Sequence, residues 1–166
     1  MARNGFPLSC ILVAENEPAD GSGMKLACER AGIAEHVFRV TDLTHATHYL
    51  AGWEAYGDRR LYPLPTLLLV DWQVAAGSGA KIVRWVRTNP FYYHLLVVVV
   101  WGGASDIDRS EANDLRINAF IKRPDSFREL MGALQVLTRF WNLNNCVEEL
   151  PQVRAGSAAS PPRDRA

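Results

Sequence analysis

Five short apolar runs, each followed by a longer amphipathic segment, constrain the fold of this chain more than any other feature. The runs are CILVA, HVFRV, TLLLV, LLVVVV and NAFI, at residues 10–14, 36–40, 66–70, 95–100 and 118–121. Runs that are apolar at successive positions are typical of strands buried on both faces. We therefore predict a strand for each run, with 10–14 read as buried and 95–100 as apolar on both faces.

The segments between and after these runs carry apolar residues at helical spacing. They predict helices over 19–32, 43–53, 79–88, 105–116 and 125–141. Five strands that alternate with five helices imply a doubly wound, five-stranded parallel sheet in an α/β/α arrangement of the flavodoxin-like type.

Composition narrows the class of protein. Lys plus Arg equals Asp plus Glu, at 18 each, which argues against a dedicated nucleic-acid binder. No run reaches the roughly 20 apolar residues that cross a bilayer, and the N-terminus lacks the pattern of a signal peptide. Cys10, Cys28 and Cys146 show no metal-binding spacing, so we expect reduced thiols in a cytoplasmic protein, the first two in the core.

Acidic residues follow two of the predicted strands. Asp71 ends the third strand, and Glu15-Asn16-Glu17 follows the first. Functional groups of open parallel sheets gather at the carboxyl ends of strands, near the switch in strand order. Oxygen ligands placed there suit Mg²⁺, and an aspartate beside the ion can accept a phosphoryl group. The alternative is that acidic residues end strands only because loops are solvated.

The segment IKRP, at 121–124, places two cations at the end of the fifth strand. Successive strand side chains face opposite sides, so Lys122 and Arg123 cannot both point at one site. The alternative is a solvated charge pair. His45 and His48 share a helix face without a third ligand, which indicates surface histidines.

Together, ILVAENEPAD, the strand ending in Asp71, the VVVV strand and IKRP resemble the receiver domain of bacterial response regulators. The long loop before the third strand and FW at 140–141 are most similar to the single-domain subgroup that includes phytochrome-associated regulators. The resemblance implies a receiver domain over 9–141 with no output domain after it. An extension over 142–166 follows; from Pro151 it is rich in Pro, Ala, Ser and Arg, and we expect disorder from about that residue.

The resemblance also implies roles for individual residues. Asp71 matches the phosphoacceptor, and a Mg²⁺ site would use Asp71, Glu15, Asn16 and the backbone carbonyl of Gln73. The remaining matches are Arg123 at the lysine position, Trp101 at the hydroxyl position, Phe120 at the aromatic switch position, and the retained glycine Gly79.

Four of these matches depart from the family pattern. Asn16 is neutral and Glu15 is one methylene longer than aspartate, so Mg²⁺ affinity should fall; Glu17 should leave the strand end on another face. Arg123 is bulkier and forked where lysine is usual. Trp101 has no hydroxyl to bind a phosphoryl oxygen.

As a member of this family, the chain would accept a phosphoryl group from a histidine kinase, such as a bacteriophytochrome-type sensor, and would not be an enzyme. It would signal through a surface of the fourth helix, fifth strand and fifth helix, to a downstream protein or a second copy in a homodimer. Two alternatives stay open. One is an adaptor that works without phosphorylation, and the less favoured one is a small flavin- or nucleotide-binding enzyme, for which the sequence lacks a phosphate-binding loop.

Overall fold

The computed structural model describes residues 8–16, 23–102 and 109–145. Its strands are β1 (Leu8–Ala14), β2 (Ala34–Val40), β3 (Leu67–Asp71), β4 (Leu96–Trp101) and β5 (Ala119–Lys122). Its helices are α1 (Met24–Ala31), α2 (Leu43–Ala51), α3 (Val74–Gly77), α4 (Gly79–Thr88), α5 (Arg109–Asp114) and α6 (Phe127–Asn145), with a 3-10 helix η1 (Glu54–Tyr56). Glu17, Cys146 and the tail from 151 lie outside the described residues.

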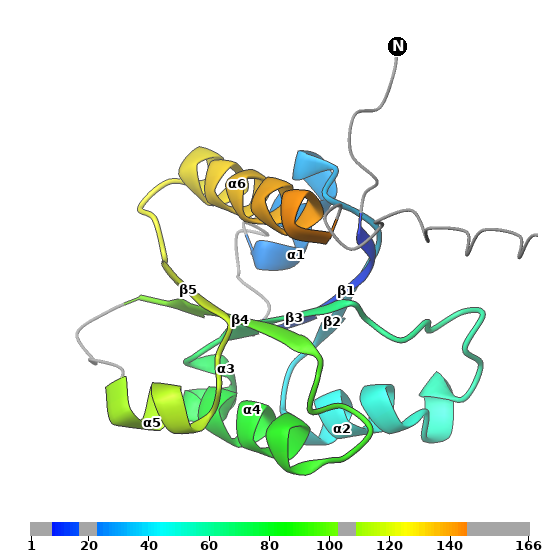
Figure 1. Cartoon of the computed structure of the whole chain (residues 1–166). Coiled ribbons are helices and arrows are strands. Elements are labelled where there is room, and N and C mark those ends of the chain that lie inside the picture. Colours follow the sequence, from blue (N-terminus) through cyan, green and yellow to red (C-terminus); the bar gives the residue numbers. More distant parts are fainter. Residues whose placement is uncertain (1–7, 17–22, 103–108, 146–166) are drawn as a thin grey trace, which may run out of the picture.

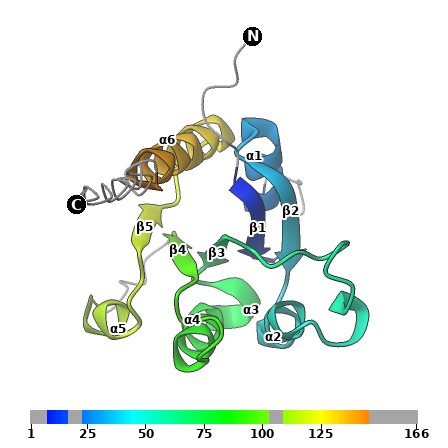
Figure 2. The same ribbon diagram turned by 45° about the vertical axis from the view of Figure 1, so that its right-hand side comes forward.

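All strand pairs of the sheet are parallel, in the order β2-β1-β3-β4-β5. Helices α1 and α6 cover one face, and α2, α4 and α5 cover the other (Figures 1 and 2). The predicted doubly wound sheet is therefore confirmed. The strand order reverses between β1 and β3, so the carboxyl ends of these two strands form the switch point of the sheet.

The core has one layer on each side of the sheet. Ile11 and Val13 pack in the layer beneath α1 and α6, whereas Leu12 and Ala14 pack in the layer against α2 and α4. Successive side chains of one strand enter opposite layers because the strand is pleated, and both layers are apolar because helices cover both faces. Cys28 is buried, as predicted, among the residues of the first layer.

An aromatic cluster orders the long segment between α2 and β3. The rings of Phe38, Tyr49, Tyr56 and Tyr62 have neighbouring centroids 5.1–6.0 Å apart. The Arg59 guanidinium donates to the backbone carbonyls of Tyr49, Leu50 and Tyr62. These contacts fix a connection that the sequence predicted only as a loop, and η1 lies within it.

Two further features bear on the expectations from the sequence. None of the helices in the described ranges is long and apolar enough to span a membrane. The short α3 was not predicted, because it arises from backbone angles with positive φ at Ala75 and Ala76 and not from a helical pattern of apolar residues.

Candidate functional site

An ion pair joins the ends of β3 and β5. Nη2 of Arg123 donates to Oδ2 of Asp71 at 2.8 Å, and the two side chains are 33% and 19% exposed. The backbone N–H of Arg123 donates to the carbonyl of Trp101, which fixes the position of the Arg123 backbone beside the end of β4. Lys122 is exposed, so only one of the two neighbouring cations faces the site, as the strand periodicity predicted.

The second oxygen of Asp71 is also held. Oδ1 accepts a hydrogen bond of 2.9 Å from the backbone N–H of Gln73. Trp72 continues the strand pairing by donating to the carbonyl of Val100. The carboxylate therefore has a fixed orientation between the turn that follows it and the guanidinium of Arg123.

Gly79 permits the close return of the chain beneath this turn. A Cβ at this position would lie 2.7 Å from the carbonyl oxygen of Trp72 and 3.0 Å from that of Asp71. Real Cβ atoms do not approach backbone oxygens so closely, so a side chain here would displace the turn that carries the aspartate. The glycine singled out from the sequence has this steric reason.

Glu15 follows β1 directly and is only 2% exposed. Its Oε2 accepts from the backbone N–H of Met24 at 2.7 Å, and its Oε1 accepts from that of Lys25 at 2.9 Å. Burial raises the pKa of Glu15, although the two N–H groups and the charges of Arg123 and Arg39 act in the opposite direction. The carboxylate thus lies within the electrostatic reach of Arg123 and is bonded to α1.

Asn16 lies next to Glu15 but is exposed and points to a different partner. Its Oδ1 accepts from the backbone N–H of Ala75 at 3.1 Å. Ala75, Ala76 and Gly77 have φ values of +45°, +57° and +94°. Two alanines in this left-handed region are strained, at a cost of roughly 1–2 kcal/mol each. Asn16 therefore ties a strained turn to the end of β1.

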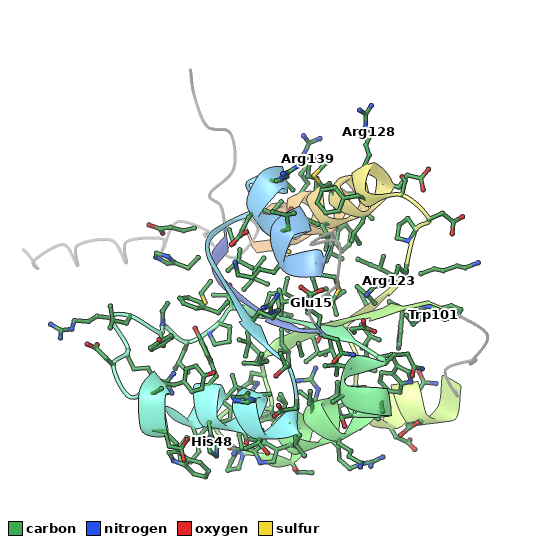
Figure 3. The ribbon with its side chains drawn as sticks, turned by 180° about the vertical axis from the view of Figure 1, so that it is seen from behind. Glu15, His48, Trp101, Arg123, Arg128 and Arg139 are labelled. Atoms are coloured by element: carbon green, nitrogen blue, oxygen red, sulfur yellow. The ribbon has the colours of Figure 1, made fainter. Side chains whose placement is uncertain are left out.

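The two remaining predicted positions lie on β4 and β5. Trp101 is the last residue of β4 and is half-buried, and Phe120 on β5 is 43% exposed. Figure 3 shows Glu15 and Arg123 between the sheet and the α1–α6 layer, Trp101 at the level of the sheet, and His48 on α2 across the sheet. The ring of His48 contacts Glu54 at 3.1 Å and that of His45 contacts Asp42, so each histidine of α2 has an acidic partner outside the site.

The structure thus gathers Glu15, Asp71 and Arg123 at the switch point and brings Asn16 and Gln73 alongside. Sequence reasoning missed the bonding of Glu15 to α1 and of Asn16 to Ala75. The sequence does contain a signal for the contact between Glu15 and α1. Gly23, before α1, offers no side-chain cap and the first turn contains no acidic residue, so the first N–H groups of the helix need an acceptor from elsewhere.

The donor set can be tested against a divalent cation. Carboxylate, amide and carbonyl oxygens are the ligands that hard cations prefer. An ionised carboxylate has about four lone-pair positions, and Glu15 and Asp71 each use two in the hydrogen bonds given above. No group of three His, Cys, Asp or Glu suited to a metal occurs in the part of the chain that the structure describes. These residues supply the types of ligand that a divalent cation prefers, but they supply little negative charge to balance the ion.

Several response regulators of known sequence or structure are similar to this chain. No protein-family model matches the chain. "Response regulator Rcp1" of a Synechocystis strain is 21% identical over 141 residues, which cover 85% of this chain and 94% of Rcp1. Its Mn²⁺-bound form has a TM-score of 0.65 over 81% of this chain and 94% of the Rcp1 chain, with 22% identity.

Two further solved structures are similar over 81% of this chain and 94% of their own, each with a TM-score of 0.69. Response regulator RPA3017, of red light signaling in R. palustris, is 28% identical. The phosphorylated cyanobacterial phytochrome response regulator RcpA is 22% identical.

Proposed function

We propose that this chain, which belongs to the receiver domains of response regulators, accepts a phosphoryl group on Asp71 from a histidine kinase. The observation that carries the proposal is the pairing of Asp71 with Arg123 at the switch point of the sheet. A carboxylate with fixed orientation beside a cation has what phosphoryl transfer requires of a protein, which is mainly positioning and charge neutralisation.

The chemistry follows from the two side chains. One oxygen of Asp71 attacks phosphorus in the phosphohistidine of the kinase. The phosphorus–nitrogen bond breaks, the imidazole leaves with a proton, and an acyl phosphate remains on Asp71. Arg123 uses one N–H group on Asp71 here, and its planar fork has further donors for the oxygens of the phosphoryl group. Trp101 contributes its backbone carbonyl to the placement of Arg123 and no hydroxyl group.

The proposed cation is Mg²⁺. The side chains of Asp71 and Asn16 and the backbone carbonyl of Gln73 would hold it, and Glu15 would add a negative charge nearby. When bound, such an ion neutralises negative charge on the phosphoryl oxygens. The Mn²⁺ present in Rcp1 supports a divalent cation in this family. Because Asn16 is neutral, we expect weak affinity.

The partners follow from the relatives and from one exposed surface. RPA3017 acts in red light signaling and RcpA is a phytochrome response regulator, which supports a bacteriophytochrome-type kinase. Phe120, Val136 and Phe140 are 43%, 68% and 64% exposed on β5 and α6. We define these three side chains as the β5–α6 patch, and it would bind a downstream protein or a second copy. The buried, free thiols of Cys10 and Cys28 support the expected cytoplasmic location.

The direct test is phosphorylation in solution. The protein is incubated with Mg²⁺ and acetyl phosphate, and its intact mass is followed with time. We expect one phosphoryl adduct on the wild-type protein, sensitive to hydroxylamine, and none on Asp71→Asn or without Mg²⁺. An adduct that persists in Asp71→Asn would contradict the assignment of the acceptor. No adduct on the wild type, with a partner retained by Asp71→Ala, would favour an adaptor that works without phosphorylation.

A further inference from the structure

Helix α1 begins without a capping side chain of its own. Its N-cap residue is Gly23, and no acidic residue occurs in its first turn. The first N–H groups of a helix have no acceptor within the helix and need one from elsewhere. Met24 and Lys25, the first two helical residues, find theirs in the carboxylate of Glu15.

The space around Glu15 is shaped for this contact. A Cβ on Gly23 would lie 2.8 Å from each carboxylate oxygen of Glu15, so any side chain at Gly23 would displace the carboxylate. Both residues are buried. Two charge-assisted hydrogen bonds and the positive end of the helix dipole favour the ionised carboxylate at this point.

The length of the side chain decides which partner Glu15 reaches. Glu15 leaves the end of β1 beside Asp71 on β3, since the two strands pair directly up to Ala14 and Val70. An aspartate would be about 1.5 Å shorter, which is half a hydrogen-bond length and enough to lose contact with α1. A shorter carboxylate would stay nearer the strand end, where the cation of the proposed function binds.

We propose that Glu15 is a helix cap that positions the first turn of α1 at the site and is not a direct ligand of the cation. The extra methylene of Glu15 therefore lowers the cation affinity of the site and stabilises α1. This inference rests on the proposed function only for the location of the cation.

Amide hydrogen exchange of Met24 and Lys25 tests the cap in the full-length protein. First-turn amides are ordinarily unprotected, so their protection reports on Glu15. We expect saturating Mg²⁺ to change this protection by less than about twofold, and Glu15→Asp to lower it by about tenfold or more. Glu29→Asp is the matched control, because Glu29 is exposed on the same helix and pairs with the Lys25 side chain; it should leave both amides protected.

The affinity for Mg²⁺ provides a second measurement, which would not change if Glu15 only stabilised α1. Half-buried Trp72 and Trp101 border the site and serve as fluorescent reporters of Mg²⁺. We expect Glu15→Asp to tighten Mg²⁺ binding by roughly threefold to tenfold, because the freed carboxylate becomes available to the ion. Gly23→Ala keeps Glu15 but pushes it off α1, so it should also tighten binding and serves if Glu15→Asp folds poorly.

Three results would overturn the inference. They are a tenfold loss of Met24 and Lys25 protection on adding Mg²⁺, retained protection in Glu15→Asp, and weaker or unchanged Mg²⁺ binding in both variants. A wild-type protein that gives no response to Mg²⁺ would instead refute the cation of the proposed function and the inferred effect of Glu15 on its affinity. The hydrogen-exchange data for Glu15→Asp would still decide whether Glu15 caps α1. Phosphorylation of Asp71, read from intact mass with Mg²⁺ present, tests the proposed function and does not depend on whether Glu15 caps α1.

Discussion

Arg123 is bonded to Asp71 through Nη2 and Oδ2 at 2.8 Å, so the carboxylate of Asp71 already has a counter-ion in this structure. Gly102 makes room for that arrangement, since a Cβ there would lie 3.0 Å from Cβ of Arg123. The guanidinium thus occupies the position from which it can stabilise charge on a phosphoryl group without a large rearrangement.

Removal of the Arg123 guanidinium should slow phosphorylation of Asp71. We expect Arg123→Gln to lower the rate of adduct formation from acetyl phosphate by about tenfold or more, because one preorganised positive charge is lost. Arg123→Lys should lose less, since it keeps the charge and gives up the fork. The rate is measured by intact mass at fixed Mg²⁺.

The neighbouring residue supplies the control. Lys122→Gln removes an equal charge from an exposed position one residue away and should leave the rate nearly unchanged. Equal slowing by Lys122→Gln and Arg123→Gln would mean that net charge, and not the contact with Asp71, controls the reaction.

The strained turn after Asp71 gives a prediction about stability. Ala76 is exposed with a φ of +57°, a conformation that glycine adopts without steric cost. Ala76→Gly should raise the free energy of unfolding by about 0.5–1 kcal/mol, measured by urea denaturation. Ala80→Gly, in the regular helix α4, should lower it by a similar amount. Destabilisation by both glycines would contradict the strain assigned to Ala76.

The sheet and the main helices could be predicted from the sequence because their signal is local. Residues 95–100 are apolar at every position, and this pattern has few solutions other than a strand covered on both faces. Helix α4 begins and ends where the pattern placed it, at 79 and 88, since Asn89-Pro90 stops a helix. Asp71 at the end of β3 followed from the same reasoning.

The partners of the site side chains could not be predicted in the same way. The bond between Asn16 and Ala75 joins residues 59 positions apart and depends on a left-handed turn at two alanines, which no propensity favours. The contact of Glu15 with α1 depends on side-chain length within a buried space. Such contacts come from tertiary packing, which sequence periodicity does not encode.

Asn16 should respond differently to two substitutions. Asn16→Ala removes the acceptor of the Ala75 N–H, so hydrogen exchange at Ala75 should accelerate by about tenfold. Asn16→Asp keeps an acceptor and adds a negative charge, so the Ala75 amide should stay protected while Mg²⁺ binds about tenfold more tightly. Tryptophan fluorescence measures the affinity, and loss of protection in Asn16→Asp would argue against the assigned hydrogen bond.

The cap of α2 gives a dependence on pH. Oδ1 of Asp42 accepts from the backbone N–H of His45 at 2.8 Å. Burial opposes ionisation of Asp42, but hydrogen bonds from the backbone and ring of His45 outweigh it and lower the pKa below the ordinary 3.8. A lowered pKa means that the unfolded chain binds more protons in this range, so stability rises with pH.

Asp42→Asn keeps a capping oxygen but not the charge. We expect the wild-type protein to be more stable than this variant by about 0.5 kcal/mol at pH values above 3.8, with the difference lost as the pH falls through the lowered pKa of the folded state. Urea denaturation at several pH values measures it. A difference that grows on acidification would show that the sign is wrong.

The β5–α6 patch provides the last prediction. Val136 and Phe140 are four residues apart on α6, so both project from one face of that helix, and Phe120 is exposed on the edge strand β5. We expect these exposed apolar side chains to contribute to a protein interface, and their removal should not affect the core. We expect Phe140→Ser with Val136→Ser to weaken self-association or partner binding by about tenfold or more while the melting temperature changes little.

Exposed Phe91, near the amino end of β4, is the matched control for loss of apolar surface; Phe91→Ser should leave association intact. Sedimentation of wild-type and variant proteins measures self-association, and an equal effect of Phe91→Ser would show that association is not specific to the β5–α6 patch.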